Sequence, residues 1–169
     1  MKFKTFLAGC LGGLLSLNSC TNSPDMTDYT AYVNPFIGTG GHGHTFPGAI
    51  VPHGMISPSP DTRIDGWDAC SGYYYADSTI NGFSHTHLSG TGCCDYGDVL
   101  LMPTVGEQKY LPTGSQSQQM AYASAFSHQN ETAEPGYYSV FLDTYQVKAE
   151  LTASKRAAIH RYTFPESKE

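Results

Sequence analysis

The residues that could do chemistry are concentrated between positions 38 and 98. Five of the seven histidines lie between positions 42 and 87, and Arg63 is the only Lys or Arg between residues 5 and 108. The carboxylates of this stretch are Asp61, Asp65, Asp68, Asp77, Asp95 and Asp98. A guanidinium makes bidentate contacts to a carboxylate or to vicinal hydroxyls. Arg63 therefore either binds a polar ligand or pairs with Asp61 or Asp65 to hold a loop.

The densest block of polar groups runs from Phe83 to Gly92 and contains His85 and His87. In an extended segment, residues two positions apart point to the same face. Two such rings suit a metal pair or two donors to a polar ligand, although each could equally be a buried, hydrogen-bonded ring. Cys93 and Cys94 follow, but adjacent cysteines are not the usual Cys-x-x-Cys spacing, so the zinc signal is weak.

Three cysteines, Cys70, Cys93 and Cys94, remain once Cys10 and Cys20 are assigned to the N-terminal segment discussed below. An odd number permits at most one disulfide among them, and adjacent cysteines rarely bond each other without strain. In an oxidising compartment Cys70 could bridge to Cys93 or to Cys94. Free, buried cysteines fit the sequence equally well.

Aromatic residues cluster at Trp67 and at Tyr73–Tyr75, inside the same stretch. Sugars present C–H faces that stack on aromatic rings, and hydroxyls that need polar partners. A pocket with flat apolar walls and a few convergent polar groups fits such a ligand. The alternative is a strand whose alternating tyrosine rings lie in the core.

The N-terminal segment is typical of protein targeting. Two lysines precede an apolar run from Phe6 to Leu17, which is too short for a stable membrane-spanning helix. The run ends in Leu17-Asn-Ser-Cys20, which resembles the lipobox of bacterial lipoproteins. We predict a signal peptide at residues 1–19, lipidation at Cys20 and a polar tether at residues 20–28. The protein would then be anchored in the periplasm or at the bacterial cell surface, with the outer membrane favoured; the alternative is an ordinary signal peptide.

The overall composition narrows the class of protein. With 40% hydrophobic residues, 14% charged residues and 12 tyrosines, the chain is not a disordered one. Its net charge is −6 and its Lys and Arg residues form no stripe, which excludes a basic nucleic-acid surface. Residues 29–106 are rich in Gly, Pro, Tyr, Thr and Ser, which disfavours a helical bundle.

The elements that must position these residues are expected to be strands and long loops. Glycines at 38–43 and four prolines at 47–60 interrupt the chain, so we predict short strands only at 49–51 and 99–102. Residues 113–129 have no clear periodicity and are interpreted as a surface excursion.

Three later runs, around residues 138–143, 147–152 and 159–164, alternate apolar and polar residues with a period of two. They predict an antiparallel meander with one face buried. The expected fold is all-β: an antiparallel β-sandwich over residues 29–169, with long Gly- and Pro-rich loops. Because the chain stops directly after a strand and open sheet edges are costly, we expect the sandwich to be incomplete and the chain truncated.

Seven short motifs indicate a family. They are Tyr32-Val-Asn-Pro-Phe-Ile-Gly-Thr39, His44-Thr-Phe-Pro-Gly48, Val51-Pro-His-Gly-Met55, Ser59-Pro-Asp-Thr-Arg63, Asp65-Gly-Trp67, Ser71-Gly-Tyr73 and Gly82-Phe-Ser-His-Thr-His-Leu-Ser-Gly-Thr-Gly92. Together they resemble the N-terminal domain of glycoside hydrolase family 92, from about Tyr29 to the C-terminus.

The resemblance implies a calcium-dependent, inverting exo-α-mannosidase that acts on α-mannoside glycans. In that family an N-terminal β-sandwich precedes an (α/α)6 barrel, which carries the catalytic acid and base and most calcium ligands. The resemblance therefore places no catalytic residue and no metal site in this chain. The N-terminal domain would supply loops that wall the substrate pocket.

By position in the family pattern, Trp67 would stack on the sugar next to the scissile bond. Polar contacts to hydroxyls, or to the loops that make them, would come from Asp61, Arg63, Asp68, His85 and His87. The pocket rim would include Cys70, Ser89 and Gly90. Ala69 stands where the family often has a second Trp, which leaves the linkage preference open.

Two functions of other classes compete with this one. The first is a non-enzymatic carbohydrate-binding lipoprotein. The second is a small zinc-binding periplasmic protein that uses His85, His87 and Cys93 or Cys94.

Overall fold

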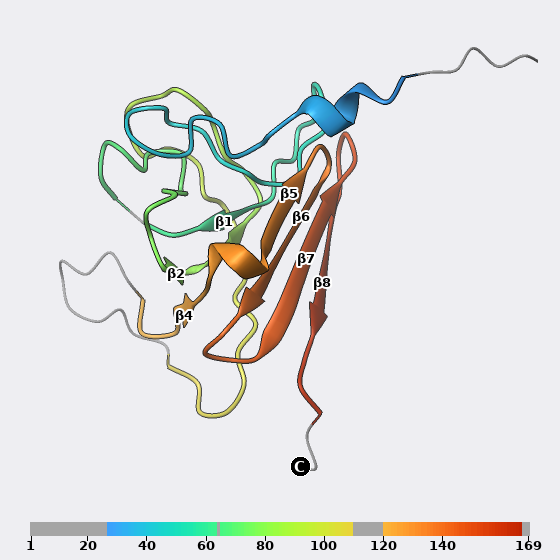
Figure 1. Ribbon diagram of the computed structural model, residues 1–169. Coiled ribbons are helices and arrows are strands. Elements are labelled where there is room, and N and C mark those ends of the chain that lie inside the picture. The colour runs from blue at the N-terminus through green and yellow to red at the C-terminus, as the bar shows by residue number, and fades with distance from the viewer. Residues whose placement is uncertain (1–26, 64, 110–119, 167–169) are drawn as a thin grey trace, which may run out of the picture.

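A computed structural model describes residues 27–63, 65–109 and 120–166. It shows an all-β protein in which a four-stranded antiparallel sheet faces a layer built mostly of loops (Figure 1). The expected all-β class with long Gly- and Pro-rich loops is confirmed. The predicted signal peptide, Cys20 and most of the tether lie outside the described residues. None of the described helices is long and apolar enough to cross a membrane.

The four-stranded sheet is a simple meander. Its strands, in spatial order, are β5 (Glu131–Glu134), β6 (Tyr137–Leu142), β7 (Val147–Ala153) and β8 (Ala158–Thr163). The three alternating runs of the sequence correspond to β6, β7 and β8, so the predicted meander is confirmed. Strand β5 was not expected, because its sequence Glu-Thr-Ala-Glu lacks the apolar alternation on which the prediction relied.

The core lies between this sheet and the loop layer. On the sheet side it consists of Tyr138, Val140, Leu142, Val147, Ala149 and Leu151, all at most 1% exposed. Tyr73, Ile80 and Phe83 pack against them from the loop layer and are equally buried. These are the residues at alternate positions of β6 and β7, which is why the period of two marked the buried face.

Two short antiparallel ribbons lie in the loop layer. Strand β1 (Ser59–Asp61) pairs with β3 (Gly82–Ser84), and β2 (Thr79–Ile80) pairs with β4 (Ser124–Ala125). Two 3₁₀ helices, η1 (Tyr29–Tyr32) and η2 (His128–Asn130), complete the described elements. Strand β1 matters most for the site, because Asp61 and Arg63 lie at and just beyond its end.

Three local predictions were wrong. Residues 49–51 form no strand: Ala49 is buried and its amide donates to the Pro58 carbonyl, but the flanking prolines provide no ladder donors. Residues 99–102 form only one isolated bridge, from Leu101 to Phe83, because Val99 has a left-handed φ of 56°. The expected surface excursion at 113–129 is only partly described. Its described part is not a plain surface loop, because it contains β4 and the buried Phe126.

Candidate functional site

A pocket of about 240 Å³ opens in the loop layer, between the end of β1 and the segment 94–100. It is lined by Asp61, Arg63, Ala69, Cys70, Ser71, Gly72, His87, Cys94, Asp95, Tyr96, Gly97 and Leu100. Four of the residues singled out from the sequence, Asp61, Arg63, Cys70 and His87, are thus brought together. The others lie at the rim or elsewhere.

The polar centre of the pocket is the buried pair Asp61 and His87. Asp61 Oδ1 lies 3.0 Å from His87 Nε2, while its Oδ2 accepts the backbone N–H of Ser84 at 2.9 Å. His87 Nδ1 faces the Ser57 carbonyl at 2.8 Å, and because a carbonyl only accepts, Nδ1 carries a proton. Nε2 is also 3.1 Å from the Ser84 hydroxyl. The ring can therefore accept from Ser84 or, when protonated at Nε2, donate to Asp61.

Gly72 permits this pair to form. Its φ is +90°, and a Cβ at this position would lie 2.3 Å from Asp61 Oδ1 and 3.0 Å from His87 Cδ2. Its carbonyl accepts the backbone N–H of Thr62 at 2.7 Å, which fixes the chain just after β1. Only glycine combines this backbone conformation with so close an approach.

One buried hydroxyl in the pocket has no partner. Ser71 is 2% exposed, and within the described residues its Oγ makes no hydrogen bond. Buried polar groups are nearly always satisfied, and an unsatisfied one costs about 1–3 kcal/mol. A hydroxyl-bearing ligand in the pocket would satisfy it.

Arg63 is held by a residue that the sequence did not indicate. Its Nε and Nη2 donate to the Asp77 carboxylate at 2.7–3.0 Å, and its guanidinium lies 4.5 Å from the centre of the Tyr74 ring. The predicted pairing with Asp61 or Asp65 is therefore wrong. The hydrogen bonds that Arg63 donates to Asp77 raise the pKa of Arg63, which stays charged. Within the described residues its Nη1 makes no hydrogen bond, which leaves that group for the pocket that Arg63 lines.

Trp67 lies on the rim rather than in the core, with 56% of its surface exposed. Its ring contacts those of His42 and His44, with centroids 4.9 and 4.3 Å away. Asp68, next to it, binds His42 Nδ1 at 2.5 Å. The edge of His44 is buried, and its Nε2 has no hydrogen-bond partner among the described residues. The indole face is thus presented on a loop that other side chains support.

His85 faces away from His87, so the prediction that both rings share one face is wrong. Strand β3 ends at Ser84, and beyond it the alternation of an extended chain no longer holds. His85 Nδ1 lies 2.7 Å from the Val99 carbonyl, and its ring stacks on His160 of β8 at 4.7 Å. Ser89 and Gly90 are exposed on the loop that follows, where the amide of Gly90 donates to the His44 carbonyl.

The cysteines and the divergent histidines do not support the zinc alternative. Cys70 is a buried free thiol, and Cys93 and Cys94 are exposed free thiols. Across the three described ranges, no group of three or more His, Cys, Asp or Glu side chains could hold a metal ion.

Several residues of the pocket were missed from the sequence. Ser71 and Gly72 belong to a family motif and Asp95 to the carboxylates of the loop region, but the sequence assigns none of them, nor Gly97, to a pocket. Tyr96 has a left-handed φ of 67° and was not singled out. The close spacing of Gly and Asp residues after the His-rich block is the sequence signal that could have indicated this side of the pocket.

Comparison with known proteins places the chain in a family. The model of the glycosyl hydrolase family 92 N-terminal domain matches residues 32–169. An uncharacterized secreted glycosidase of Arthroderma benhamiae is 32% identical over 139 residues, which are 82% of this chain and 18% of that protein.

Solved structures give the same result. A family GH92 α-mannosidase from Bacteroides thetaiotaomicron, solved alone and with mannoimidazole, is 50% identical with a TM-score of 0.76; the match covers 82% of this chain and 18–19% of that one. A family GH92 inverting mannosidase from the same species is 32% identical with a TM-score of 0.65, over 85% of this chain and 19% of that one. The chain thus spans about a fifth of the length of the proteins it matches.

Proposed function

The chain belongs to glycosyl hydrolase family 92, and we propose that it is the N-terminal part of a calcium-dependent, inverting exo-α-mannosidase acting on α-mannoside glycans. The observation that carries the proposal is the 50% identity, at a TM-score of 0.76, to an α-mannosidase that binds mannoimidazole. The described pocket agrees with it, since it offers hydroxyl-binding groups and an unpartnered buried serine.

In this proposal the pocket forms part of the wall of the sugar site. Asp61 and His87 exchange hydrogen bonds with sugar hydroxyls. Arg63 donates a hydrogen bond to a sugar hydroxyl through Nη1, the nitrogen that does not bind Asp77. Trp67 offers its exposed indole face to a C–H face of the sugar, with Asp68 holding the adjacent His42. Cys70 lines the floor, and Ser89, Gly90 and His85 belong to the surrounding loop rather than to the pocket.

The chemical step itself needs two carboxyl groups about 6.5–9.5 Å apart on opposite sides of the scissile bond, with room for a water molecule. This carboxyl pair and the calcium ion would belong to the part of the protein that corresponds to the unmatched part of its relatives. The described residues offer no cluster of three or more metal-ligand side chains, so they do not fit calcium, and none of the roles above depends on it.

Secretion through the predicted signal peptide, with lipid attachment at Cys20, is part of the same proposal. A relative is named a secreted glycosidase, which supports export. The lipid anchor rests on the Leu17–Cys20 sequence alone.

The test is the stereochemistry of hydrolysis by the complete protein. An aryl α-mannoside should be hydrolysed, and proton NMR recorded in the first minutes should show β-mannose before mutarotation produces the α-anomer. First appearance of α-mannose would overturn the inverting mechanism. Turnover of other glycosides without α-mannosides would overturn the substrate class.

A further inference from the structure

Two loops that line or border the proposed substrate pocket contact each other at its mouth. One is the turn Gly66–Cys70, closed by the Cys70 amide, which donates to the Trp67 carbonyl at 3.3 Å. The other is the segment Gly92–Cys94. A Cβ on Gly92 would lie 3.1 Å from Trp67 Nε1, so this segment touches the indole.

A thiol lies at the contact between these loops. The Sγ of Cys94 is 3.6 Å from the Gly66 carbonyl, where its S–H donates a weak hydrogen bond. Cys70 stands at the other end of that same turn, and both Cys70 and Cys94 line the pocket. Burial raises the pKa of the Cys94 thiol, and the nearby Cys70 raises it further. Cys93 is exposed, and it does not line the pocket.

We propose that Cys70 and Cys94 form a disulfide that ties the Trp67 turn to the Gly92–Cys94 segment when the protein meets a disulfide oxidant. Both cysteines are thiols in the structure described here, so the bond is a modification of this pair. Three of the four residues with left-handed φ in the segment 90–97 are glycines, Gly90, Gly92 and Gly97, so the backbone that carries Cys94 can adjust toward Cys70 at low steric cost.

The reaction is thiol–disulfide exchange with a disulfide-bearing oxidant, such as a thiol oxidase or oxidised glutathione. The exposed Cys94 loses its proton, and its thiolate attacks one sulfur of the oxidant. That breaks the oxidant's S–S bond and releases the first thiolate. Deprotonated Cys70 then attacks Cys94 Sγ, which forms the Cys70–Cys94 bond and expels the second thiolate. The protein loses two protons and two electrons, and the oxidant is reduced to two thiols.

A bond here would fix the indole-bearing turn against the opposite rim of the pocket. The raised pKa of Cys94 means that less thiolate is present at neutral pH, so exchange should accelerate as the pH rises above neutral. Neither the restraint of the Trp67 turn nor the pH dependence of the exchange requires the proposed mannosidase activity. This inference is therefore tested independently of that activity.

The experiment treats the complete protein with oxidised glutathione, blocks the remaining thiols, and digests it with chymotrypsin without reduction. Aromatic residues at positions 73–75 and 83 allow cleavage between the two cysteines, whereas trypsin would leave them in one peptide. Mass spectrometry should find a linked pair of peptides lighter by about 2 Da than the two thiol peptides.

The exposed neighbours Cys93 and Cys94 provide matched variants. Cys93→Ser should keep the linked pair, and Cys94→Ser should lose it. Absence of any linked pair in the oxidised wild-type protein would overturn the proposal. Linkage that survives Cys94→Ser and disappears in Cys93→Ser would overturn it as well, because it would assign the bond to Cys93.

Discussion

Single residues decide whether the pocket exists in this form. Asp61 and His87 come from positions 26 apart in the sequence, and Gly72, which lies against both side chains, leaves room for their contact because it has no side chain. The sequence indicates both residues as candidates for the site, but it does not indicate that they contact each other. A test at the residue scale should therefore begin with the glycine.

Replacing Gly72 by Ala is expected to destabilise the protein by about 2–5 kcal/mol, because it combines a left-handed backbone with a steric clash against the Asp61 carboxylate. Gly106→Ala is the control: its φ is +83°, but nothing lies within 4 Å of its added Cβ. It should cost only about 1–2 kcal/mol. Denaturant unfolding of both variants measures the difference, and equal losses would contradict the steric explanation.

Trp67→Ala tests the stacking role in the complete protein. The indole is 56% exposed and makes no core contact, so we expect a loss of roughly 1–3 kcal/mol in transition-state binding, or about ten- to a hundredfold in kcat/KM. The acid and base pKa values read from the pH–rate profile should not move, because an indole transfers no proton.

The control for this variant is Tyr32→Ala, which removes an even more exposed ring remote from the pocket lining. It should leave kcat/KM unchanged. A large drop in melting temperature for Trp67→Ala, with uniform loss of activity on all substrates, would show that Trp67 supports its loop instead of binding sugar.

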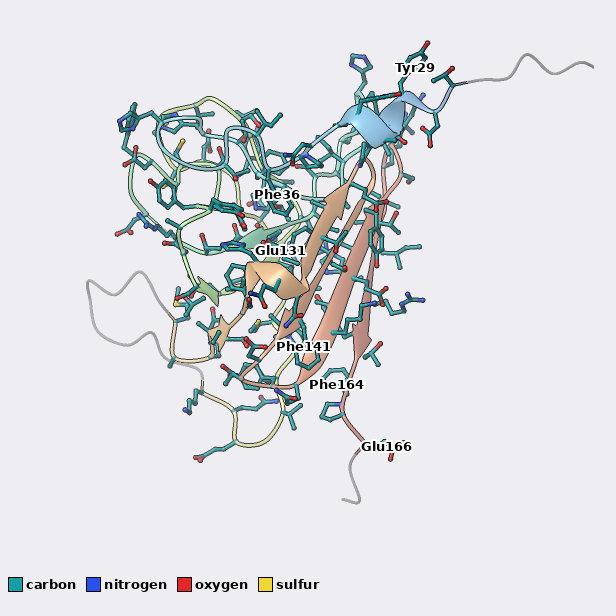
Figure 2. The ribbon with its side chains drawn as sticks, in the orientation of Figure 1. Tyr29, Phe36, Glu131, Phe141, Phe164 and Glu166 are labelled. Atoms are coloured by element: carbon teal, nitrogen blue, oxygen red, sulfur yellow. The ribbon has the colours of Figure 1, made fainter. Side chains whose placement is uncertain are left out.

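At the scale of elements, the sheet and the loop layer are joined by a buried carboxylate at the start of β5. Figure 2 shows Glu131 between the sheet and the loops. It accepts the hydroxyls of Tyr73 at 3.1 Å and Tyr138 at 2.6 Å, and its other oxygen lies 2.6 Å from His128 Nδ1. Burial raises the pKa of both tyrosines, which keeps them as donors. No sequence pattern indicates this network, because Tyr73 lies 58 residues away from Glu131.

Glu131→Ala should cost about 3–5 kcal/mol of unfolding free energy, because it leaves two buried hydroxyls without an acceptor. Glu134 is the matched control, since it belongs to the same strand and is exposed. Glu134→Ala should change stability by less than about 0.5 kcal/mol. Similar small effects for both substitutions would show that the network contributes little.

Strand β8 carries a pH-dependent contact with the loop layer. Burial, together with the adjacent His85 stacked at 4.7 Å, lowers the pKa of His160 to about 4. The Tyr162 hydroxyl lies 2.8 Å from His160 Nδ1. An unfolded histidine titrates near about 6.5. Between these values the unfolded chain binds a proton that the folded chain does not, so stability falls as the pH decreases from about 6.5 to about 4.

His160→Gln should flatten that part of the stability profile, measured by denaturant unfolding at pH values of about 7 and 4.5. His53 is exposed, and His53→Gln serves as the control that should keep the wild-type slope. An unchanged slope in His160→Gln would mean that other groups cause the loss of stability in acid.

At the scale of the whole molecule, Figure 1 shows the loop layer at the left and strand β8 at the far right edge of the four-stranded sheet. The outer face of the sheet is covered by an ionic cluster, in which Arg161 donates twice to Glu150 at 2.7 Å and Tyr137 donates at 2.8 Å. The hydrogen bonds from Arg161 lower the pKa of Glu150 to about 2.

Large apolar side chains remain exposed on the loop side, Ile37, Met55 and Val99 among them.

Residues 20–169 alone are expected to hydrolyse no aryl α-mannoside. Family resemblance places the acid and base outside this chain, and the two carboxylates that line the described pocket are occupied or exposed: Asp61 binds His87, and Asp95 is exposed. Assay of the purified polypeptide against a heat-denatured control measures this. Turnover that disappears on Asp61→Asn or Asp95→Asn would contradict the prediction and place a catalytic carboxylate in this pocket.

The sequence by itself determined the family, the all-β class and the meander of β6, β7 and β8. Motifs and a period of two are local properties, which each strand carries in its own residues. It also indicated that residues 38–98 hold the polar groups of a site, and the pocket residues Asp61, Arg63, Cys70 and His87 come from that stretch.

Only the tertiary structure decided which of these groups meet. The partner of Arg63 is Asp77 rather than a nearer Asp, and His85 and His87 point apart although two positions separate them. In loops without a ladder, side-chain directions depend on backbone turns and on contacts with distant segments, such as the left-handed Gly72 and the Gly66 carbonyl that holds Cys94. Such contacts join residues 11 to 30 positions apart, and no local pattern encodes them.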